Sequence, residues 1–84
     1  MTKREKIISR IILARSIGLS PDDIRVIEQN LSDVSLFVID DFKGYNFVIS
    51  FKTVPTVEEA REEIKEMYLF SVEMDFQEEF EKSK

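Results

Sequence analysis

The sequence predicts an α+β fold with the element order α-α-β-β-α, in which a two-stranded antiparallel hairpin packs against helices. The main observation is the segment 34–51, VSLFVIDDFKGYNFVISF, which places two runs of strand-forming residues around a turn. Apolar residues recur at helical spacing both before and after this segment. Because a lone hairpin is only marginally stable in water, we expect the flanking helices to cover its apolar face.

A first helix is expected over residues 3–17. Thr2 and Glu5 have the spacing of a capping box, and Gly18 is suited to end the helix. The residues at helical spacing are Ile7, Ile8, Ile11, Ile12, Ala14 and Ile17.

A second helix is expected to begin at Ser20 and to run to about Asn30. Ser20 is a good N-cap, Pro21 suits the first turn, and Asp22 and Asp23 complement the positive end of the helix dipole. The inward-facing residues would be Ile24, Ile27 and Leu31.

The hairpin is expected to turn over residues 41–44, with Gly44 at the positive-φ position of a bulged three-residue loop. This register places Asp41 opposite Tyr45, Ile39 opposite Phe47 and Phe37 opposite Ile49. One face then carries Phe37, Ile39, Tyr45, Phe47, Ile49 and Phe51. The other carries Val34, Leu36, Val38, Asn46, Val48, Ser50 and Lys52.

A long helix is expected to follow a second capping box formed by Thr56 and Glu59. Its apolar residues form two stripes, the first made of Val57, Ala60, Ile64, Met67 and Tyr68 and the second of Leu69, Val72, Phe76 and Phe80. The stripes lie more than about 100° apart around one axis, so either the helix breaks near residues 68–71 or one helix serves two surfaces. A third strand over residues 68–74 is disfavoured, because Glu73 and Asp75 would lie beside a sheet.

The second stripe has two interpretations. It can close the hairpin face that carries Leu36, Val38 and Val48, or it can anchor a partner protein or a second copy of the chain.

Composition restricts the function. Eighty-four residues suit one small domain, and the absence of cysteine and histidine removes disulfides, thiolate metal sites and the commonest general base. We therefore expect neither catalysis nor a bound metal or cofactor.

Pro21-Asp22 with Asp41-Phe42-Lys43 matches the linear pattern of metal-dependent nucleases, but these residues fall at a helix start and in a turn. No apolar run is long enough to span a membrane and no signal peptide is visible, so we expect a cytoplasmic protein.

The join between the first two expected helices resembles the helix-turn-helix of phage-repressor-like DNA-binding domains. Ala14, Gly18, Ile24 and Ile27 match that family in spacing. The resemblance implies a recognition helix beginning after Ser20, although Asp22 and Asp23 would then face phosphate. The first helix is basic, with Lys3, Arg4, Lys6, Arg10 and Arg15. A DNA-binding regulator or antitoxin is therefore the alternative function.

The strongest surface signal is acidic: the net charge is −5 overall, and ten of the acids lie in residues 56–84. In size, charge and element order the chain resembles small acidic phage-borne inhibitors of the anti-CRISPR kind. The resemblance implies a non-enzymatic inhibitor that docks on a basic surface of a partner protein, where it can mimic nucleic acid. The predicted partner-binding residues are Glu58, Glu59, Glu62, Glu63, Glu66, Glu73, Asp75, Phe76, Glu78, Glu79 and Phe80.

Overall fold

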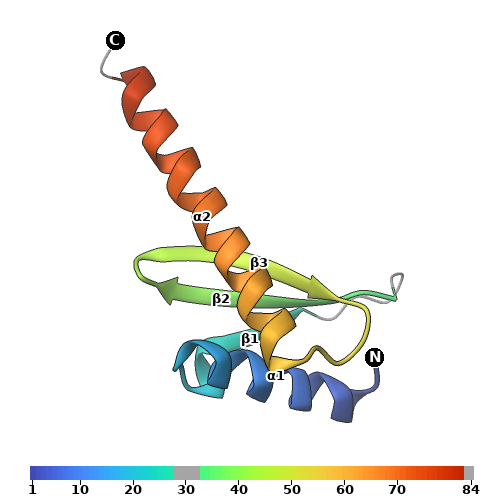
Figure 1. Ribbon diagram of the computed structural model, residues 1–84. Coiled ribbons are helices and arrows are strands. Elements are labelled where there is room, and N and C mark those ends of the chain that lie inside the picture. Colours follow the sequence, from blue (N-terminus) through green and yellow to red (C-terminus); the bar gives the residue numbers. More distant parts are fainter. Residues whose placement is uncertain (28–32, 83–84) are drawn as a thin grey trace.

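The computed structural model describes residues 1–27 and 33–82 and confirms the α+β class (Figure 1). Its elements are α1 (Lys3–Ile17), the 3-10 turn η1 (Pro21–Asp23), β1 (Ile24–Ile27), β2 (Ser35–Phe42), β3 (Tyr45–Phe51) and α2 (Val57–Lys82). The strands form one antiparallel sheet in the order β1-β2-β3. Both helices pack on the same face of this sheet, and α2 continues well beyond it.

The predicted caps of α1 are confirmed. Thr2 Oγ1 accepts a hydrogen bond from Glu5 N at 3.2 Å, and Glu5 Oε1 accepts one from Thr2 N at 3.2 Å. Hydrogen bonds that the Thr2 backbone N–H and the Thr2 side chain make to the Glu5 carboxyl lower the pKa of that carboxyl. Gly18 takes the left-handed conformation with φ of 72°, and its N–H donates to the carbonyl of Ala14.

The buried side of α1 includes only some of the residues that recur at helical spacing. Leu13, Ala14 and Ser9 are fully buried, whereas Ile7 and Ile8 are 52% and 39% exposed. The Ser9 hydroxyl donates to the Glu5 carbonyl at 2.8 Å, which satisfies it in the interior.

The predicted second helix is wrong. Ser20 does cap a helical turn, since its hydroxyl accepts from Asp22 N at 3.3 Å, but the turn is a single 3-10 turn and the chain then enters β1. Three of the four residues of β1 are β-branched, and pairing with β2 gives them a full ladder while covering an edge that β2 would otherwise expose. Ile24 is buried as predicted, Ile27 is not, and Leu31 lies outside the described residues.

The hairpin register is confirmed through most of its length, because Phe37 pairs with Ile49 and Ile39 pairs with Phe47. The predicted pair of Asp41 with Tyr45 is wrong: Phe42 pairs with Tyr45, and the register shifts between Ile39 and Phe42. The loop is therefore the two-residue turn Lys43-Gly44, and the bulge lies in β2.

Positive φ values mark both features. They are 52° at Lys43 and 84° at Gly44 in the turn, and 54° at Asp41 in the bulge. The Asp41 N–H donates to Asn46 Oδ1 at 2.7 Å, which gives the bulged backbone a partner across the strand.

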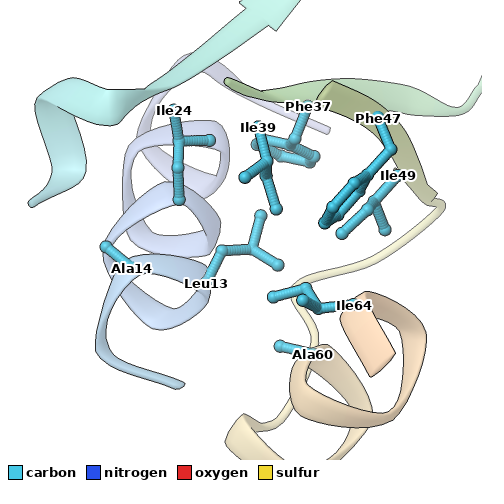
Figure 2. Close-up of a cluster of buried hydrophobic side chains, with 9 residues drawn as sticks. All are labelled: Leu13, Ala14, Ile24, Phe37, Ile39, Phe47, Ile49, Ala60 and Ile64. Carbon is cyan, nitrogen blue, oxygen red and sulfur yellow. The ribbon is translucent and has the colours of Figure 1, made fainter. Parts of the chain in front are cut away.

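The core lies between the sheet and the two helices (Figure 2). It consists of Leu13 and Ala14 from α1, Ile24 from β1, Phe37 and Ile39 from β2, Phe47 and Ile49 from β3, and Ala60 and Ile64 from α2. None of the helices that the structure describes lies on the opposite face of the sheet, and Val48 there is 42% exposed. The interpretation that the second stripe of the long helix closes this face is therefore wrong.

Helix α2 is unbroken, so the alternatives of a break near residues 68–71 and of a third strand over residues 68–74 are wrong. Ala60 and Ile64 are buried, and Met67 and Tyr68 pack against the core, whereas Val57 is 43% exposed. Beyond Tyr68 the helix runs on for about 20 Å at 1.5 Å per residue. The molecule is correspondingly elongated, at 49 × 30 × 20 Å.

Candidate protein-binding surface

Every residue that the sequence predicts to bind a partner lies on α2, and every one is exposed. Because α2 does not break, the direction of each side chain follows from one period of about 100° per residue. On this basis the predicted residues do not form a single ridge. They divide between two sides of the helix.

The first group, which we call the glutamate face, points away from the core. Its members fall within an arc of about 140°, centred about 150° from the direction of Ala60 and Ile64. They are Glu58, Glu59, Glu62, Glu63, Glu66 and Glu73. The arc contains no lysine or arginine, since Arg61 and Lys65 lie at its margin.

The second group of acids comes later in the helix and lies on the side that faces the body. It consists of Asp75, Glu78 and Glu79, whereas Glu81, five full turns after Glu63, points to the edge of the glutamate face. Asp75 makes a contact with the sheet, because its Oδ2 accepts a hydrogen bond from the Tyr45 hydroxyl at 2.9 Å. That hydrogen bond, with desolvation and the nearby negative charge, raises the pKa of the Tyr45 phenol.

The glutamate face borders an open hollow with an aromatic wall. Phe51, at the end of β3, is half-buried against Phe37, with ring centroids 6.2 Å apart. The hollow is lined by Phe51, Glu58, Glu59, Glu62 and Glu63. A guanidinium group stacks on an aromatic ring and binds carboxylates through paired N–H donors, so this arrangement suits an arginine of a partner.

Within residues 1–27 and 33–82, the carboxylates of the glutamate face take no part in ion pairs. Ion pairs elsewhere in the molecule join Arg10 to Asp22 at 3.7 Å and Arg25 to Asp40 at 2.8 Å. The negative charge of the face is therefore presented to solvent.

Three cations gather instead on the neighbouring side of α2. Lys43, Arg61 and Lys65 line a small cavity of about 220 Å³ together with Ile17, Phe42, Ile64 and Tyr68. The ammonium of Lys43 lies 5.4 Å from the Phe42 ring centroid and 5.1 Å from that of Tyr68, at cation–π distance. The long helix thus carries a basic patch beside its acidic face.

The basic first helix is not part of a helix-turn-helix, because residues 21–27 form a 3-10 turn and a strand. Arg10 is engaged in holding that turn: its Nε donates to the Pro21 carbonyl, and its Nη2 pairs with Asp22. Lys3, Arg4 and Arg15 are exposed. The recognition helix implied by the resemblance is therefore missing, although a basic surface remains.

The nuclease-like residues are not assembled into a site. Asp22 lies in η1, and Asp41 lies in the β2 bulge. Within residues 1–27 and 33–82, no three histidine, cysteine, aspartate or glutamate side chains converge to hold a metal ion.

Comparisons with protein-family models, with curated proteins and with solved structures find no match for this chain. The described helices include none with the length and apolar character needed to cross a lipid bilayer.

Two exposed apolar surfaces were missed from the sequence. Phe70 and Met74, which are 56% and 52% exposed, line an open groove beside Tyr45 and Asp75. The face of the sheet opposite the core exposes both Ile27 and Val48. The alternation in the sequence Ile-Arg-Val-Ile could have predicted that residues 24–27 form a strand of this sheet. Arg25 and Asp40 pair on this face through two hydrogen bonds of 2.8 and 3.2 Å.

Proposed function

We propose that this protein is a non-enzymatic protein-binding module that docks its glutamate face on a basic surface of a partner protein. The observation that carries the proposal is the set of six exposed carboxylates on one side of a rigid helix, unpaired within the described molecule. Exposed like charges at i,i+4, such as Glu58 with Glu62 and Glu62 with Glu66, destabilise a helix slightly. A binding role accounts for an arrangement that folding alone disfavours.

The spacing of these carboxylates favours an inhibitor that mimics nucleic acid. Five glutamates lie between residues 58 and 66, which span about 12 Å of helix axis, so one charge occurs about every 3 Å. One strand of B-DNA carries a phosphate about every 3.4 Å of axis. A basic groove built for one phosphate strand therefore meets a similar density of negative charge on α2.

The aromatic hollow adds a contact that a row of phosphates lacks. An arginine placed over Phe51 would be partly desolvated, and its pairing with Glu59 or Glu63 would be stronger than that of a fully exposed pair. We therefore expect the partner surface to be rich in arginine as well as basic overall.

The test compares two variants of equal charge. Glu59→Lys, Glu62→Lys and Glu63→Lys together reverse the glutamate face. Asp33→Lys, Glu78→Lys and Glu81→Lys change the net charge by the same amount at exposed sites outside residues 58–73, which hold the face. Each protein is immobilised and presented to a lysate of the native host at low and at high salt.

The proposal predicts that wild type and the control variant capture the same basic protein, that the face variant loses it, and that salt and single- or double-stranded DNA displace it. Equal loss with both variants would indicate attraction by net charge alone and would refute the proposal. Retention of wild type on duplex DNA or heparin would instead favour the DNA-binding alternative through α1.

A further inference from the structure

The part of α2 that leaves the body, residues 69–82, is unusually apolar for a projecting helix; we call it the overhang. Leu69 is 49% exposed, Phe76 is 68% exposed and Phe80 is 57% exposed. Val72 between them is half-buried. Monomeric proteins rarely leave contiguous apolar side chains of this size in water, and such patches usually mark an interaction site.

These four residues, the apolar strip, have the spacing of a helix-packing seam. They occur at i, i+3, i+7 and i+11 and fall within an arc of about 80°. The strip faces away from the direction of Ala60 and Ile64, so the protein's own core does not cover it. Leu69 and Phe76, at its start and middle, are therefore accessible to another helix.

Charges of opposite sign flank the two ends of the strip. Arg61 and Lys65 precede it, and Glu79 lies within its C-terminal part. All three point to the same edge of the strip, within an arc of about 40°. This edge of α2 is therefore basic at one end and acidic at the other, whereas Glu62 and Glu73 lie along the opposite edge of the strip.

We propose that the strip binds the same strip of a second copy of this chain, with the two α2 helices antiparallel. A two-fold axis beside Val72 pairs residues whose numbers add up to about 144, which brings Lys65 opposite Glu79 of the second copy. Phe76 then meets Tyr68 and Leu69 of the second copy. The interface is isologous, because each contact occurs twice.

The cavity beside Lys43 supports this orientation. It is lined by Phe42, Tyr68 and Lys65, and it lies along the edge of α2 where the overhang of the second copy would pass. Its three cations, Lys43, Arg61 and Lys65, suit Glu79 of the second copy, because Glu79 lies on this edge of the strip.

Other occupants fit this charge pattern less well. Two parallel helices would bring Lys65 against Lys65 and Glu79 against Glu79. Amphipathic helices that lie on membranes carry lysine and arginine on their polar face, whereas the overhang carries Asp75, Glu78 and Glu81. An unrelated protein groove remains as an outcome of the test.

The pure protein is tested alone by sedimentation equilibrium over micromolar to millimolar concentrations, so the result is independent of the partner proposed above. Wild type is expected at twice the chain mass of 9.9 kDa. Phe76→Glu should raise the dissociation constant by about a hundredfold or more, because it places a charge in the apolar centre twice. Met74→Glu, at a site of the same helix that is 52% exposed and lies outside the strip, should leave the dissociation constant unchanged.

A charge exchange tests the antiparallel register. Lys65→Glu and Glu79→Lys should each weaken the dimer by about tenfold, and the two combined should restore it. Unchanged circular dichroism excludes unfolding as the cause, since all these side chains are exposed. A wild type that stays monomeric would overturn the proposal and leave the strip to an unrelated partner. So would a dimer that persists in Phe76→Glu, or a combined variant that is not restored.

Discussion

The two halves of α2 form one helix but direct their apolar and acidic residues to opposite sides. Residues 57–68 turn Ala60 and Ile64 into the core and their glutamates outward. Residues 69–82 turn Leu69 and Phe76 outward and several acids toward the side of the body. The first half is therefore held in place by packing against the core. The second half is also amphipathic, but its apolar residues do not pack against the core.

The part of α2 that stabilises the fold is therefore distinct from the part that projects from the body. A helix that only had to close the core could end after Tyr68, the last residue of α2 that packs against it. Exposed phenylalanines beyond that point contribute little to folding, and the dimer proposed above gives them a role.

The largest expected effect distinguishes the two halves directly. Ile64→Ala removes a side chain that is 1% exposed and should lower the free energy of unfolding by about 2–4 kcal/mol. Phe76→Ala removes a larger side chain that is 68% exposed, and in the monomer it should change that energy by less than about 0.5 kcal/mol. Urea unfolding at a protein concentration where the chain is monomeric measures both. Comparable losses would mean that the overhang packs on the body.

The next effect concerns Tyr68, which joins the two halves. Its ring meets those of Phe42 and Tyr45 edge-on, with centroids 5.5 and 5.7 Å apart. Tyr68→Ala should cost about 2–3 kcal/mol, because it removes both aromatic pairs and buried area, whereas Tyr68→Phe keeps the ring and should cost much less. Urea unfolding compares the two. Amide exchange of the overhang should be faster in Tyr68→Ala, and identical exchange would show that Tyr68 does not anchor it.

Local rules predicted the first half of α2 and the hairpin well. The hydroxyl of Thr56 accepts from Glu59 N at 3.1 Å as its spacing predicts, and the alternation of Phe37 and Ile39 fixes the inner face of the sheet. These features depend on neighbours in the sequence or on a short turn. The bulge at Asp41 was misplaced because its alternatives differ by one residue in the loop.

The strand at residues 24–27 was missed because it depends on pairing with β2, which local sequence rules do not show. Ser20 and Pro21 give a real helix start, but β2 offers residues 24–27 a ladder, and the three β-branched residues there favour it over a helix. The division of the predicted partner-binding residues between two sides was not foreseen, because the order of glutamates along the sequence does not show their direction. Only the unbroken axis of α2 shows that Glu59 and Glu78 point to different sides.

The smallest expected effect is the pH response of the contact between Tyr45 and Asp75, which ties the start of the overhang to the sheet. Only the protonated phenol donates this hydrogen bond, and the folded-state pKa of Tyr45 is raised above its ordinary value of 10.0. The stabilisation is therefore complete below the unfolded-state pKa and is lost as the pH rises through the raised folded-state value. The chain has two tyrosines, so in Tyr68→Phe the near-ultraviolet absorbance of phenolate reports Tyr45 alone. Adding Asp75→Asn should move this titration to lower pH, since the carboxylate no longer opposes the phenolate charge. An unmoved titration would mean that the overhang is free of the sheet already at Asp75, and the boundary between the two halves would then lie at Tyr68 itself.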